Sequence, residues 1–141
     1  MIITIEIPDD YMSLAIRDVL EKIEELINLK STVSTPEQLE ELEKEIVQTT
    51  DELASAVTAL KLQKYLDSAE LKDKASDLID HYPRKMKNQG RRKVKVRALR
   101  GPDFEIYTTY YSRKGKKKGG KRRGLYPVLI SIGNQIIALL P

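Results

Sequence analysis

Hydrophobic and polar residues alternate over the first eight positions of the chain, and this pattern predicts a short β-strand over residues 1–8 that ends at a proline. The spacing of hydrophobic residues then changes to three and four, which predicts an amphipathic helix over residues 11–30 with one apolar face. Asp9 or Asp10 is placed to cap this helix, and a loop is expected over residues 31–34.

A strong helix start follows at Thr35. Thr35 can serve as the N-cap, Pro36 occupies the first helical position, and Gln38 is placed to complete a capping box. From there, apolar or small residues recur at alternating spacings of three and four, which is typical of a heptad seam: Leu39, Leu42, Ile46, Thr49, Leu53, Ala56 and Leu60. Thr49 and Ala56 weaken this seam.

A separate helix is expected beyond the seam, because the phase of the apolar positions changes over residues 62–69. Asp67 with Glu70 could cap it, and Tyr82-Pro83 would close it, since proline disfavours helix in the residue before it. Two arrangements of the helical arm fit the pattern. One is an antiparallel helical hairpin, and the other is a coiled-coil homodimer formed through the seam.

The pattern changes again after residue 83. Residues 84–90 predict a basic linker, and alternating residues around Val94 and Ile106 predict two strands joined by a turn at Gly101-Pro102-Asp103. Residues 125–140 predict a short apolar segment that begins as a helix. The expected fold class is therefore α+β. A long helical hairpin or arm (1–83) precedes a small β-hairpin unit with a flexible basic loop (84–141).

Charge divides the chain at nearly the same point. Residues 1–80 contain 8 Lys and Arg against 19 Asp and Glu, whereas residues 81–141 contain 17 Lys and Arg and only Asp103 and Glu105 as acids. Such an asymmetry predicts that the basic region binds a polyanion.

The predicted β-hairpin of the basic region has two different faces, because side chains alternate along a strand. One face is apolar and available to pack on the helices: Val94, Val96, Ala98, Phe104, Ile106 and Thr108. The other combines cations with aromatic rings, the pairing that nucleic-acid surfaces use: Lys93, Lys95, Arg97, Tyr107 and Tyr111. An ordinary exposed sheet face has a similar composition, so both interpretations stay open.

A basic run beside the hairpin favours nucleic acid. Its eight cations are interspersed with glycines: Arg113, Lys114, Lys116, Lys117, Lys118, Lys121, Arg122 and Arg123. Charges this dense repel one another, which predicts a flexible segment that phosphates neutralise through counterion release. A solvated loop and an anionic membrane surface are the alternatives. Phosphate contacts of this kind give affinity without sequence recognition.

Few residues are candidates for catalysis. The chain has no cysteine, and His81, its one histidine, lies at a predicted helix end, where capping or surface exposure explains it. No metalloprotease, phosphate-loop or nucleophile-elbow motif is present. We expect a non-enzymatic, cytoplasmic protein without a secretory signal, a membrane span, a cofactor, a metal or a small-molecule substrate.

The segment Tyr110-Tyr111-Ser112, the basic run and the segment Arg123-Gly124-Leu125-Tyr126-Pro127-Val128-Leu129 together resemble a bacterial insertion-sequence transposase. In that family a helical arm and a β-hairpin with paired tyrosines precede an RNase H-like core with three acidic metal ligands. The resemblance covers roughly residues 90–133. Residues 132–141 differ from the family's continuation, so the resemblance implies a truncated or frameshifted copy that keeps the non-catalytic, DNA-binding portion.

Two other functions fit the same residues. Tyrosines on a sheet face beside a glycine- and lysine-rich loop also suit an RNA- or ribosome-associated basic protein. The third possibility is a helical protein-interaction module whose basic tail is incidental.

Overall fold

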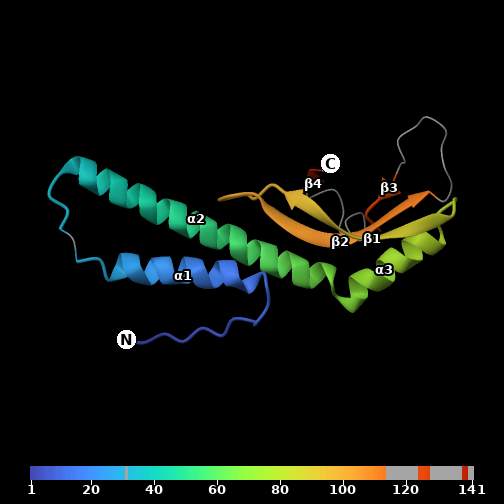
Figure 1. Ribbon diagram of the computed structural model, residues 1–141, viewed down its shortest axis with the longest axis horizontal. Coiled ribbons are helices and arrows are strands. Elements are labelled where there is room, and N and C mark those ends of the chain that lie inside the picture. Colours follow the sequence, from blue (N-terminus) through green and yellow to red (C-terminus); the bar gives the residue numbers. More distant parts are fainter. Residues whose placement is uncertain (31, 114–123, 128–137, 140–141) are drawn as a thin grey trace. The chain divides into compact units, whose positions relative to one another are not determined.

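The computed structural model describes residues 1–30, 32–113, 124–127 and 138–139. Its elements are helices α1 (Ser13–Ile27), α2 (Pro36–Leu66) and α3 (Ala69–Asp80), and strands β1 (Met86–Val96), β2 (Phe104–Arg113), β3 (Gly124–Leu125) and β4 (Ala138–Leu139) (Figure 1). The expected α+β class is confirmed.

The chain forms two compact units that interleave in sequence. The first contains residues 1–60 and 98–104, and the second contains residues 61–97 and 105–141. Helix α2 therefore contributes its longer portion to the first unit and its last turns to the second. The change of charge near residue 83 falls inside the second unit.

In the first unit, α1 and α2 lie side by side and run in opposite directions (Figure 1). Ile16 and Val19 on α1 are buried, and Lys22 joins the two helices through an ion pair with Glu52 at 3.3 Å. Helix α1 begins beside Asp10, whose carboxylate accepts hydrogen bonds from the backbone N–H and the hydroxyl of Ser13, both at 2.9 Å.

The expected strand over residues 1–8 is wrong. Its isoleucines alternate as predicted, but Ile2, Ile3 and Ile5 are exposed and the segment has no regular structure. A strand is stabilised by hydrogen bonds and side-chain pairs with a neighbouring strand, and the local pattern cannot supply that neighbour.

Helix α2 starts where the capping residues predicted. Thr35 Oγ1 accepts a hydrogen bond from Gln38 N at 3.2 Å, and Gln38 Oε1 accepts one from Ser34 N at 2.8 Å. The seam is not continuous, however. Thr49 and Leu60 are buried, whereas 48% of Leu39 and 42% of Ile46 are exposed.

The second unit packs the end of α2 and α3 with the sheet. Its core includes Leu66, Leu71, Ala75, Val94 and Ile106, all of them buried. The cap of α3 is Ser68, whose hydroxyl accepts from Leu71 N at 3.4 Å, and not Asp67 as expected.

The strands form one sheet in the order β3-β2-β1-β4. Strand β3 pairs antiparallel with β2, with Tyr111 opposite Leu125, and β4 pairs antiparallel with β1, with Val96 opposite Ala138. Two expectations are corrected. Residues 86–90 belong to β1 and not to a linker, and the expected helix does not include Leu125, which lies in β3, although Pro127 is helical. Residues 128–137 lie outside the described residues.

No helix in the described portion of the chain is long and apolar enough to cross a lipid bilayer.

Candidate nucleic-acid interface

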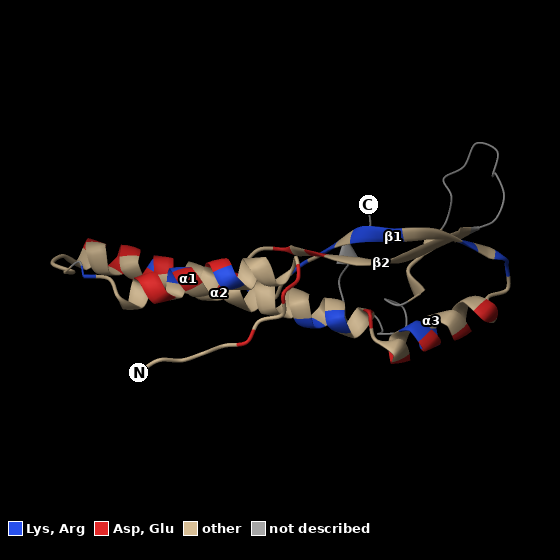
Figure 2. Cartoon of the chain, turned by 60° about the horizontal axis from the view of Figure 1, so that its bottom comes forward, with Lys and Arg blue, Asp and Glu red and all other residues tan. Residues whose placement is uncertain are grey.

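The alternation predicted for the β-hairpin is confirmed on β1. Val94 and Val96 are buried, and Lys93, Lys95 and Arg97 between and after them are exposed. On β2, Ile106 and Thr108 are buried. The three cations therefore form a row along the solvent side of the sheet, which we call the cation row, and Figure 2 shows the blue of Lys and Arg along β1.

One member of the cation row has an acidic neighbour. Lys93 Nζ lies 3.4 Å from Glu105 Oε2 on β2, and both side chains are about half exposed, 55% and 52%. An ion pair in this setting contributes little to stability. Lys95 and Arg97 are exposed and form no ion pair with the described residues.

The two tyrosines predicted for this surface are half-buried. Tyr107 is held through its backbone by Gln63 of α2, with Tyr107 N donating to Gln63 Oε1 at 2.7 Å and Gln63 Nε2 donating to Tyr107 O at 2.9 Å. Tyr111 pairs in register with Leu125.

Arg91 is a cation of the same strand that the sequence pattern did not single out. Its Nη2 lies 3.2 Å from Asp67 Oδ1 and donates to Tyr107 O at 3.3 Å, while Gln63 Nε2 lies 3.1 Å from Asp67 Oδ2. Arg91 therefore helps to hold the strands to the end of α2. Arg91 lies in a run of basic residues, so the sequence alone could not show that it pairs with a carboxylate and does not bind phosphate.

Tyr110, Gly124 and Tyr126, three residues of the segments that resemble a transposase, lie close together. The rings of Tyr110 and Tyr126 have centroids 5.0 Å apart, and the guanidinium of Arg92 lies 4.5 Å over the Tyr110 ring. A side chain at Gly124 would overlap the Tyr110 ring. Burial raises the pKa of the Tyr126 hydroxyl; the charge of Arg92 acts in the opposite direction and Tyr110 adds to the rise.

The turn between the strands is anchored within the first unit. Arg100 Nε donates to Asp51 Oδ1 at 2.9 Å, and the Ser55 hydroxyl donates to the carbonyl oxygen of Pro102 at 2.5 Å. Gly101 has a positive φ of 81° and lies so close to the backbone of Asp51 that a Cβ atom would overlap the Asp51 carbonyl.

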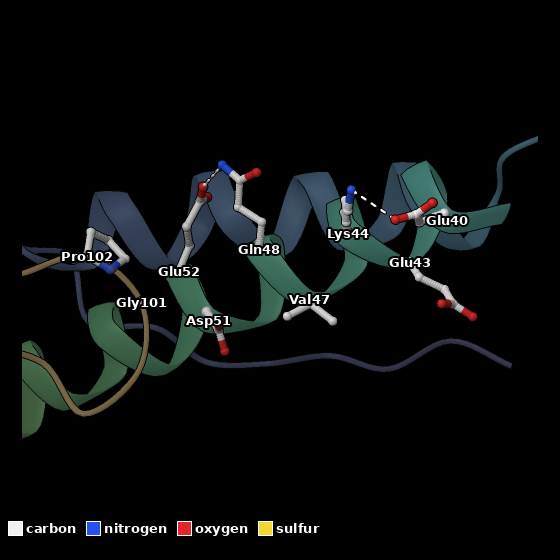
Figure 3. A pocket seen from close by; sticks show the side chains of 9 residues that line it. All are labelled: Glu40, Glu43, Lys44, Val47, Gln48, Asp51, Glu52, Gly101 and Pro102. Carbon is white, nitrogen blue, oxygen red and sulfur yellow. Dashed lines mark hydrogen bonds and ion pairs between the residues drawn. The ribbon is translucent and has the colours of Figure 1, made fainter. Parts of the chain in front are cut away.

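A groove of about 660 Å³ lies in the first unit between this turn and α2 (Figure 3). Val47, Gly101 and Pro102 line it together with carboxylates, of which Glu40 pairs with Lys44 at 3.2 Å. Negative charge disfavours phosphate, so this groove does not belong to the candidate interface.

The structure describes only some of the other residues that the sequence singled out. Arg113 ends β2, and the rest of the basic run, residues 114–123, lies outside the described residues. His81 is the C-cap of α3, with Nδ1 2.8 Å from the carbonyl oxygen of Asp77, so the capping interpretation is confirmed. No three histidines or carboxylates of the described residues are grouped so that they could hold a metal ion.

Comparison with known proteins leaves the chain without an identified relative: no family model, no curated protein and no solved structure matches it.

Proposed function

We propose that this protein binds DNA, without cutting or joining it, through the cation row on β1 and the basic run that follows β2. The observation that supports this proposal most directly is the strict alternation of buried Val94 and Val96 with exposed Lys93, Lys95 and Arg97. A strand that is anchored on one side and cationic on the other presents its charges in a fixed line.

The spacing of the cation row suits a phosphate backbone. Alternate residues of a strand are about 6.6 Å apart, so each cation can reach a different phosphate. A two-stranded ribbon also fits the major groove of a duplex. The tyrosines on β2 add rings that can stack on bases or sugars. Most of the affinity should come from phosphates, and the protein should discriminate little between sequences.

The decisive experiment measures how binding to duplex DNA depends on salt. Replacing Lys93, Lys95 and Arg97 by glutamine should weaken binding and lower the slope of log K against log salt by about 0.9 for each phosphate that the variant no longer neutralises. The matched control replaces Lys61, Lys64 and Lys72, three exposed helical lysines of the second unit, and removes the same charge.

An unchanged slope in the cation-row variant, or an equal change in the control, would contradict the proposed surface. The same titration on a variant neutralised at Lys116, Lys117, Lys118, Lys121, Arg122 and Arg123 measures the share of the basic run. Competition between duplex DNA, single-stranded DNA and structured RNA separates DNA binding from an RNA- or ribosome-associated role. The absence of salt-sensitive binding to all three would favour a helical interaction module.

The proposal includes the expectation that the protein does not catalyse DNA cleavage or joining. Strand transfer needs several carboxylates that converge on two metal ions. In the basic region of the chain the carboxylates are Asp103 and Glu105, and Glu105 pairs with Lys93. We expect the purified protein to retard DNA in a gel and to leave it intact in magnesium or manganese. Metal-dependent nicking that Asp103→Ala abolishes would contradict this expectation.

The packing of Tyr110, Gly124 and Tyr126 is compatible with the setting we propose, the DNA-binding portion of a transposase-like protein in the cytoplasm. Self-association through α2 belongs to the same proposal. Leu39 and Ile46 are seven residues apart and partly exposed, as the a positions of a coiled coil would be before a second copy covers them.

A further inference from the structure

We propose that the connection between α3 and β1 holds a second nucleic-acid contact, a pocket for one unpaired nucleobase. This inference rests on the proposed DNA binding and adds to it the kind of DNA that is preferred. The second unit has a hollow of about 360 Å³ at this connection, and the residues that line it include Ile79, Asp80, Tyr82, Arg84, Lys85 and Met86.

Apolar, aromatic and charged side chains line the hollow together. Ile79 and Met86 are half-buried, and Tyr82 is 37% exposed, so part of the tyrosine side chain is accessible to a ligand. The last turn of α3 fixes the backbone at this point, because Tyr82 N donates to Ile79 O at 3.2 Å and His81 N donates to Asp77 O at 3.1 Å. A ring on an anchored backbone is a suitable platform for stacking a base.

The charges around the hollow distinguish the base of a nucleotide from its phosphate. Arg84 and Lys85 offer cations to phosphate, and Figure 2 shows blue on the connection between α3 and β1. Asp80 also lines the hollow and would repel phosphate, but its carboxylate can accept a hydrogen bond from the N–H groups of a base edge. A base stacked on Tyr82, with its phosphates near Arg84 and Lys85, would use both kinds of side chain.

The hollow lies on the same strand as the cation row. Met86 begins β1 and Lys93 follows seven residues later. At about 3.3 Å per residue the two positions are roughly 23 Å apart, which corresponds to about seven base-pair steps of 3.4 Å. Since the faces and the Watson–Crick edges of paired bases are occupied within a duplex, stacking on Tyr82 requires a base that is unstacked and unpaired, at an end or a distortion.

Fluorescence anisotropy of the full chain with two probes tests this inference. One probe is a blunt duplex, and the other is the same duplex with a single-stranded extension that carries 2-aminopurine at its first unpaired position. We expect the extended probe to bind more tightly, and stacking to quench its 2-aminopurine. Tyr82→Ala should weaken the extended probe by roughly tenfold, the size of one base–aromatic stack, and should hardly change the blunt duplex.

Two variants make the result specific. Tyr82→Phe should retain both the affinity and the quenching, because it keeps the ring. Tyr65→Ala removes another partly exposed tyrosine of the second unit that does not line the hollow, and it should change neither probe. Circular dichroism of each variant verifies the fold.

The outcomes separate the inference from the proposed function. If both probes bind with strong salt dependence but Tyr82→Ala affects them equally, or affects neither, the nucleobase pocket is wrong and DNA binding stands. If neither probe binds, the proposed function is wrong and the pocket falls with it. Lys85→Glu gives a further check, since it should weaken the extended probe more than the blunt one.

Discussion

The side-chain amide of Gln63 pairs with both backbone polar groups of Tyr107, accepting from the N–H at 2.7 Å and donating to the carbonyl oxygen at 2.9 Å. A glutamine of α2 thereby takes the position that a residue of another strand would hold beside β2. In the described residues β3 pairs with β2 at Tyr111 and Ser112, and Gln63 satisfies the backbone farther along the same strand.

This pairing predicts a stability loss in Gln63→Leu. Gln63 is 7% exposed, and leucine would leave the partly buried N–H of Tyr107 without its partner, which costs about 1–3 kcal/mol of unfolding free energy. Urea unfolding followed by circular dichroism measures the loss. Gln48→Leu is the matched control, because Gln48 is exposed on the same helix and bonds only weakly to Glu52 at 3.5 Å. Equal losses in the two variants would contradict the role of Gln63.

A second prediction compares two glycines with nearly the same backbone conformation. Gly90 has φ 83° with open space where a Cβ would lie, whereas Gly101 has φ 81° and faces the backbone of Asp51. Gly90→Ala should cost about 1–2 kcal/mol from the positive φ alone. Gly101→Ala should cost clearly more, because the turn must also move away from α2. Thermal melting of the two variants measures this difference in stability. Similar melting temperatures would refute the close approach at Gly101.

The exposure of the helical seam gives a third prediction. Leu71→Ala should cost about 2–5 kcal/mol, because Leu71 is 1% exposed, whereas Ile46→Ala should cost less at low protein concentration. If α2 self-associates through Leu39 and Ile46, Ile46→Lys should also shift the sedimentation coefficient toward that of a monomer. Val57→Lys, at another partly exposed apolar residue of α2, is the control. A wild-type protein that sediments as a monomer at all concentrations would contradict self-association.

The fourth prediction concerns alkaline pH. Burial raises the pKa of Tyr126 above its ordinary value in the folded protein, so between the unfolded and the folded pKa the native state retains a proton that the unfolded state has lost. The contribution of Tyr126 to stability is therefore complete below about pH 10, the usual pKa of tyrosine, and decreases as the pH rises above it. Unfolding free energies from pH 8 upward should fall less steeply in Tyr126→Phe. Parallel pH profiles of the two proteins would contradict this assignment.

Local features of the sequence predicted those elements of the structure that depend on neighbours along the chain. The cap at Thr35 and the two faces of the hairpin follow from side chains one to four residues apart, and both are present. The strand expected at residues 1–8 failed because strand formation depends on a distant partner. The exposure of Ile46 could not be foreseen either, because it depends on where α1 covers α2.

The candidate site shows the same division. The exposure of Lys93, Lys95 and Arg97 could be predicted, because side chains alternate between the two faces of a strand. The ion pair of Arg91 could not be predicted in this way, because its partners, Asp67 and Tyr107, are 24 and 16 residues away in the sequence. Arg91 of β1 binds a carboxylate, whereas the exposed Arg97 just after β1 forms no ion pair with the described residues. Only the path of the whole chain distinguishes them.

The anchored turn has a consequence for the order in which the protein can mature during synthesis. The first unit includes residues 98–104, yet its other residues end at Leu60. A ribosome adding about 5–20 residues per second needs several seconds to pass from one to the other. During that interval Asp51 and Ser55 have been synthesised, while Arg100 and Pro102 have not. The helical pair must therefore persist on its own packing until the turn has been synthesised.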